Sequence, residues 1–228
     1  MTITTTILFR LAGAAAVFAG LIFIGVQINH PYLDATSITT PDVMARNSLK
    51  MLMAALALAG ITGMYLRQVT KIGVLGLLGY VLFAAGYLSM LGTEYVAALV
   101  LPSIAHSATA YVNDVIAVAN NHPATGDIGL MHAALLFTGI TYISGGFIFA
   151  IAMFRANVLA RWAAALLALG TLATIAVSFV PQYERLFAVP TGLALVGLGY
   201  SLWHEQRAPT APPILNPVSS QLDAVGAK

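Results

Sequence analysis

The sequence predicts an all-α membrane protein, a polytopic bundle of about six transmembrane helices with both termini in the cytoplasm. Of the 228 residues, 59% are hydrophobic and only 8% are charged, whereas a soluble domain usually carries about 25% charged residues. The apolar residues gather in six long segments separated by polar connections. A helix needs roughly 20 such residues to cross the hydrocarbon core of a bilayer.

The six segments follow one another along the chain at approximately residues 8–28, 48–66, 72–105, 129–154, 162–180 and 186–203. The first has the position of a secretory signal, but its apolar run is longer than a signal core, so we expect a membrane helix. Thr40-Pro41-Asp42 combines a capping residue, a first-turn proline and an acidic residue. This motif places the start of the second helix near Pro41.

The third segment is longer than a bilayer requires. The excess predicts either a tilted helix that projects outward or a bend at Gly92-Thr93. In the connection after it, Ser107 or Thr109 is expected to cap a short helix that ends near Asn120. We expect this helix to lie on the outer surface of the membrane.

The distribution of Lys and Arg predicts the orientation, because cytoplasmic connections carry an excess of them. One side collects seven of the ten, and Arg46, Lys50 and Arg185 lie on the other. The predicted organisation is a membrane domain over residues 1–203, with outer loops 29–47 and 102–128. Residues 204–228 contain four prolines and are expected to form a disordered cytoplasmic tail.

Small residues recur within the segments, and such residues let helices approach closely in lipid. Three small-x-x-x-small pairs and a run of glycines at three-residue spacing are expected to seat neighbouring helices: Ala16 with Gly20, Gly146 with Ala150, Gly197 with Ser201, and Gly73, Gly76 and Gly79.

Several function classes are excluded by composition and motif. The chain has no Cys, which removes disulfides, thiolate metal sites, iron–sulfur clusters and cysteine nucleophiles. It contains no Gly-x-Ser-x-Gly, Walker or Rossmann motif. The basic residues form no patch for a nucleic acid. No motif names a reaction, so enzymatic activity and cofactors stay open.

Four residues near the predicted outer edge of the hydrocarbon are candidates for ligand binding: Glu94, Lys50, Arg46 and His132. Ionisable residues are costly inside a membrane and tend to mark sites. Arg46 and Lys50 are four residues apart and share one helix face. One interpretation is that both cations reach the outer headgroups and Glu94 pairs with one of them. The other is that Glu94 accepts a proton or binds a ligand.

The histidines His30, His106, His122 and His132 are all predicted on the outer side. Together with Glu94, Asp114 and Asp127 they contain enough nitrogen and oxygen donors for a zinc site, or for haem ligation by two of them. The sequence has no His-Glu-x-x-His motif, which favours independent surface histidines.

Three functions follow as hypotheses. The first is a non-catalytic binding, scaffold or subunit protein, whose outward-facing polar vestibule takes a small or lipid-like ligand. The partners expected for it are a small hydrophobic ligand or a partner membrane subunit. The second is a membrane-embedded enzyme or redox protein that uses Glu94 and the outer histidines. The third is a small proton-coupled carrier.

The layout, and the Arg10-Leu11-Ala12-Gly13 start of the first segment, resemble small bacterial six-helix integral membrane proteins of unassigned activity. These proteins have a long outer loop after the first helix and another after the third. The resemblance implies a multi-pass protein of the inner membrane, with the lipid bilayer as its surroundings, and it carries no catalytic residues across.

Overall fold

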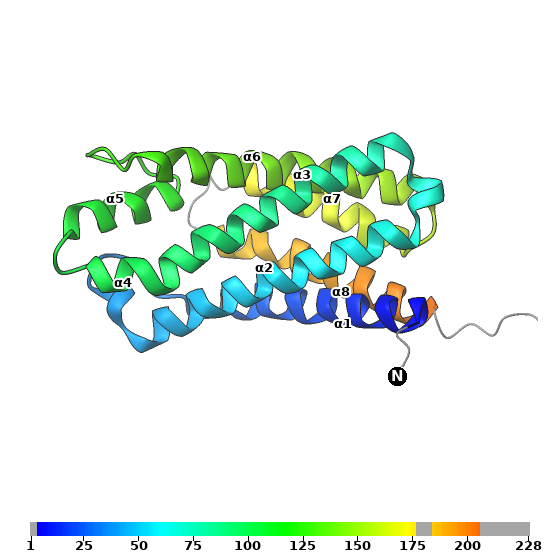
Figure 1. Cartoon of the computed structure of the whole chain (residues 1–228), viewed down its shortest axis with the longest axis horizontal. Coiled ribbons are helices and arrows are strands. Elements are labelled where there is room, and N and C mark those ends of the chain that lie inside the picture. The colour runs from blue at the N-terminus through cyan, green and yellow to red at the C-terminus, as the bar shows by residue number, and fades with distance from the viewer. Residues whose placement is uncertain (1–3, 177–183, 206–228) are drawn as a thin grey trace, which may run out of the picture.

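A computed structural model describes residues 4–176 and 184–205 of the chain (Figure 1). These residues form helices and no strand, which confirms the predicted all-helical fold class. The long helices of the bundle are α1 (Thr5–Gly25), α2 (Pro41–Arg67), α3 (Val69–Tyr95), α6 (Leu130–Ala156), α7 (Arg161–Ala176) and α8 (Glu184–Glu205). Four short elements lie between them: η1 (Ser37–Thr39), η2 (Val96–Val100), α4 (Leu101–Ile104) and α5 (Thr109–Ala119).

Four helices in the described residues are long and apolar enough to cross a membrane: Thr5–Gly25, Pro41–Arg67, Val69–Ile104 and Leu130–Ala156. Each of the six predicted segments overlaps one of the six bundle helices. The third segment continues through η2 and α4, and the fifth extends past the described end of α7. The predicted tail lies outside the described residues beyond Glu205. Helix content and length therefore fit a membrane protein.

Small residues bring the helices together, as the sequence predicts. A side chain at Gly79 or Gly86 of α3 would overlap the backbone of α6, and one at Gly145 of α6 would overlap the backbone of α3. Gly20 of α1 and Gly192 of α8 approach each other in the same way. Backbone contact this close is typical of helix pairs in lipid.

Gly73 departs from the predicted packing role. Its φ is +64°, and nothing lies within 4 Å of the position its Cβ would occupy. The non-helical backbone at this residue interrupts α3 directly after its first turn, and a positive φ of this kind costs glycine little. Gly73 thus bends the turn between α2 and α3.

The short elements form a separate layer at one end of the bundle (Figure 1). We call η1, η2, α4, α5 and the connections around them, residues 26–40 and 105–129, the outer layer. It has a hydrophobic core of its own, built from Ala35, Ile38, Val43, Leu101, Ala105, Val112, Val115, Ile116 and Ile128. The predicted short helix is therefore present as α5, and its apolar residues pack in this core.

Two details of the outer layer correct the sequence analysis. Neither Ser107 nor Thr109 caps α5, because their hydroxyls donate to the carbonyls of Ile104 and Ala105 in the preceding turn. The chain does not bend at Gly92-Thr93: α3 continues to Tyr95 and widens into the π-helical turn η2. The start of α2 at Pro41 is as predicted.

The π-helical turn is linked to α2 through a buried amide. Asn47 is 2% exposed, and its Nδ2 donates to the carbonyl oxygen of Ala97 at 3.3 Å. A π-turn shifts backbone carbonyls out of the regular helical pattern, and such turns are frequent at functional sites. The amide of Asn47 therefore fixes the end of the long third helix beside α2.

Candidate functional site

A cavity of about 1060 Å³ lies in the outer layer. One wall comes from residues 27–34, which follow α1, and another from α5 and the connection after it. Lys50 of α2 is the lining residue contributed by a long bundle helix. The lining residues are Gln27, His30, Pro31, Tyr32, Leu33, Asp34, Lys50, Ala110, Asn113, Asp114, Ile116, Ala117, Asn120, His122, Pro123 and Thr125.

The α5 wall is held by the carboxylate of Asp114. Its Oδ1 accepts from the backbone N–H and the hydroxyl of Thr125, at 2.8 and 2.9 Å, and its Oδ2 accepts from the N–H of Gly126 at 3.0 Å. The N–H of Thr125, with that hydroxyl and the N–H of Gly126, lowers the pKa of Asp114 below the ordinary value. Asp114 thus stays ionised and keeps the connection folded back on α5.

The opposite wall is built around Asp34. Its Oδ1 accepts from the N–H groups of Ser37 and Thr36, at 2.6 and 2.9 Å. The N–H of Ser37 is the main cause of the lowered pKa of Asp34. The two walls are tied together where the N–H of Ala35 donates to Oδ1 of Asn113 at 2.8 Å. The shape of the cavity therefore depends on polar contacts between the two outer connections.

Lys50 of α2 lines the cavity, and its charge acts on Glu94 of α3. Both are half-buried, and Lys50 is the cation that interacts electrostatically with Glu94. Within the described residues the two charges form no ion pair at 4.0 Å or less. The predicted partnership of Glu94 with a cation of α2 thus involves Lys50, acting over a longer distance.

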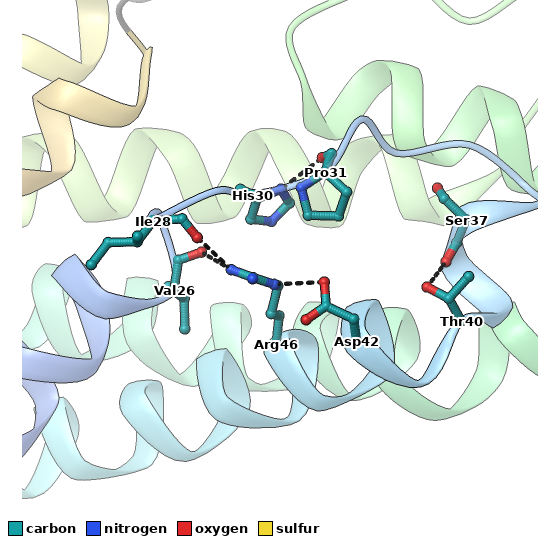
Figure 2. Close-up of polar contacts among 8 residues, drawn as sticks. All are labelled: Val26, Ile28, His30, Pro31, Ser37, Thr40, Asp42 and Arg46. Carbon is teal, nitrogen blue, oxygen red and sulfur yellow. Dashed lines mark hydrogen bonds and ion pairs between the residues drawn. The ribbon is translucent and has the colours of Figure 1, made fainter.

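Arg46 binds Asp42 and the backbone at the end of α1. Its Nε donates to Oδ2 of Asp42 at 2.9 Å, and its Nη1 donates to the carbonyl oxygens of Val26 and Ile28 at 3.2 and 2.8 Å. Figure 2 shows the guanidinium between these groups, directly after the end of α1. Arg46 also lines a smaller pocket of about 250 Å³. Of the two cations considered for Glu94, Arg46 is thus engaged by Asp42 and the end of α1.

The four histidines predicted on the outer side fall into two pairs, of which one lines the large cavity and the other does not. His30 and His122 line the large cavity, whereas His106 and His132 line neither this cavity nor the smaller pocket and are exposed. In the described part of the chain, no three His, Asp or Glu side chains form a group that could hold a metal ion.

Sequence reasoning missed most of the cavity. Gln27, Tyr32, Asn113 and Asn120 line it, and none of them was a candidate. The sequence did contain one indication of these residues. The predicted short helix has a polar side, and an amphipathic helix turns such a side away from its apolar core. The polar residues on it are Asn113, Asp114 and Asn120. Of the four predicted ligand-binding residues, Lys50 lines the cavity and Glu94, Arg46 and His132 do not.

Comparison of the chain with protein-family models, with curated proteins and with solved structures finds no match.

Proposed function

We propose that this chain is a binding protein of the bacterial inner membrane, whose outer cavity is a vestibule for a small polar molecule. In this proposal the chain crosses the membrane six times, and both termini are cytoplasmic. The observation that carries the proposal is the cavity of about 1060 Å³ between the two outer connections. Small-molecule sites commonly have volumes of roughly 300 to 1,000 Å³ and combine apolar walls with a few placed polar groups.

Six crossings are supported by the length of α8 and by the position of the ends. The 22 residues of α8 extend over about 33 Å at roughly 1.5 Å per residue, enough for a bilayer core. In Figure 1 the start of α1 and the end of α8 lie together, at the end opposite α5. Basic residues of the α2–α3 and α6–α7 turns, Lys71 and Arg161 among them, favour the cytoplasm for that end.

Cysteine labelling tests this topology, and the chain has no native Cys to remove. Ser107 of the outer layer and Lys71 of the α2–α3 turn are both exposed. We expect a membrane-impermeant maleimide added to intact spheroplasts to label Ser107→Cys, and to label Lys71→Cys only after lysis. Labelling of Lys71→Cys in intact spheroplasts, with protection of Ser107→Cys, would place the cavity in the cytoplasm and refute the orientation.

Filling the cavity tests the binding function. Ala110 is exposed on α5 and lines the cavity, so Ala110→Trp adds bulk to it without disturbing the outer core. Ala119→Trp is the matched control, because Ala119 is exposed on the same helix and does not line the cavity. We expect small polar molecules that co-purify with the wild-type protein to remain with Ala119→Trp and to be lost with Ala110→Trp, as measured by native mass spectrometry.

Other outcomes of that measurement separate the remaining hypotheses. Equal retention in all three proteins would count against the cavity as the binding site. A co-purifying lipid lost only with Ala110→Trp would replace the polar ligand by a lipid-like one. A membrane subunit lost in the same way would indicate a scaffold.

A further inference from the structure

The polar side chains that line the cavity differ in how many hydrogen bonds they already make within the protein. Both oxygens of the Asp114 carboxylate accept hydrogen bonds from Thr125 and Gly126. Oδ1 of Asp34 accepts two backbone N–H groups. These two acidic side chains therefore serve mainly to build the walls, and their internal hydrogen bonds compete with any cationic ligand.

Lys50 is in the opposite situation. Within the described residues, its ammonium makes no hydrogen bond and no ion pair at 4.0 Å or less, and Glu94 attracts it only over a longer distance. Lys50 is half-buried and is the sole Lys or Arg among the described lining residues. An ammonium group has three donors and no acceptor, and leaving it partly desolvated without a partner is costly.

Other side chains that line the cavity carry N–H donors that could bind the same ligand as Lys50. The Oδ1 of Asn113 already accepts the N–H of Ala35, and the NH₂ of the same amide carries two N–H donors that can serve a ligand. Gln27 and His122 also line the cavity and each can donate. The side chains available to a ligand thus offer one positive charge and several N–H groups.

We propose that the cavity binds the carboxylate of a small organic acid through an ion pair with Lys50, supported by the amide of Asn113. This inference rests on the proposed binding function and adds the chemical class of the ligand. A monoanion is favoured over a phosphate dianion, because Lys50 is the sole Lys or Arg among the described lining residues, the carboxylates of Asp34 and Asp114 line the same cavity, and like charges repel. Tyr32, Leu33 and Ile116 supply apolar lining, which favours an acid with an apolar body.

The experiment is equilibrium dialysis of the purified full-length protein against labelled benzoate, with benzamide as the neutral molecule of the same shape. We expect benzoate to bind the wild-type protein and Lys71→Met, a control that removes an exposed cation outside the cavity. Lys50→Met should weaken benzoate binding by about tenfold or more, equivalent to the loss of roughly 1.4 kcal/mol, whereas Lys50→Arg should retain most of it. Benzamide should bind weakly to every variant.

A second variant guards against misfolding. Lys50→Met leaves the charge of Glu94 without its cation, so Lys50→Met/Glu94→Gln restores neutrality. If Lys50→Met fails to fold, the double variant must show the same loss of benzoate binding.

The outcomes that overturn the inference differ from those that overturn the proposed function. Equal binding of benzoate and benzamide, unchanged in the Lys50 variants but abolished by Ala110→Trp, would refute the carboxylate assignment and leave the binding function intact. Lys50-dependent binding of inorganic phosphate or glycerol 3-phosphate in preference to benzoate would replace the carboxylate by a phosphate, free or on a lipid headgroup. If none of these probes binds the wild-type protein, the carboxylate inference fails. If, in addition, Ala110→Trp retains the co-purifying molecules as the wild-type protein does, the proposed binding function fails as well.

Discussion

Gly145→Leu is expected to disrupt the contact between α3 and α6, whereas Gly139→Leu on the same helix is expected to have little effect. A Cβ at Gly145 would overlap the backbone of Leu82 and Phe83 on α3, and backbone cannot move aside as a flexible side chain can. At Gly139 nothing lies within 4 Å of the added atom. Overpacking of a well-packed core typically costs about 1–3 kcal/mol, and contact with backbone places Gly145→Leu at about 3 kcal/mol or above.

The measurement is unfolding of the purified variants in mixed micelles, with helix content followed by circular dichroism. The free energy of unfolding should fall sharply for Gly145→Leu and stay within about 1 kcal/mol of the wild-type value for Gly139→Leu. Similar stability of the two variants would show that α3 and α6 are not packed backbone to backbone at this level.

Arg46→Met is expected to destabilise the link between α1 and α2 by about 1.5–3 kcal/mol, the range for hydrogen bonds that involve a charged group. The guanidinium binds the carbonyls of Val26 and Ile28, which follow the last turn of α1, and its side chain is 20% exposed. Asp42, at 62% exposure, contributes only a surface ion pair, and such pairs are worth about 0–1 kcal/mol. Asp42→Asn should therefore cost much less.

Thermal unfolding of both variants separates the two roles of Arg46, and hydrogen exchange of residues 26–30 gives the local effect. Faster exchange is expected for Arg46→Met and near-native exchange for Asp42→Asn. If both substitutions cost the same, the ion pair rather than the carbonyl contacts holds the end of α1.

The helices could be predicted because each is determined locally. Apolar runs of sufficient length define the long helices, and Thr40-Pro41-Asp42 defines the start of α2 through residues adjacent in the sequence. The cap at Ser107 or Thr109 was predicted wrongly, since each hydroxyl had a competing acceptor in the preceding turn. The unexpected break at Gly73 depends on one glycine with a positive φ, which hydropathy does not register.

The cavity was harder to predict because its walls are distant in the sequence. Hydropathy fixes which segments cross a membrane but not which faces meet. It therefore revealed neither that Asn113 binds the backbone of Ala35 nor that Arg46 turns to the end of α1. Lys50 was found because a cation within an apolar segment is conspicuous. The uncharged Gln27 and Asn120 gave no such signal.

The separate core of the outer layer has a consequence for biosynthesis. Ile38 of η1 and Val43 of α2 come early in the chain, whereas Leu101 of α4 and Val112 and Ile116 of α5 come later. During synthesis Ile38 and Val43 emerge before α3. Their apolar side chains therefore stay exposed until α4 and α5 have been synthesised. The outer layer therefore closes late, and a ribosome stalled before α5 would leave a nascent chain whose first outer connection is open to proteases and chaperones.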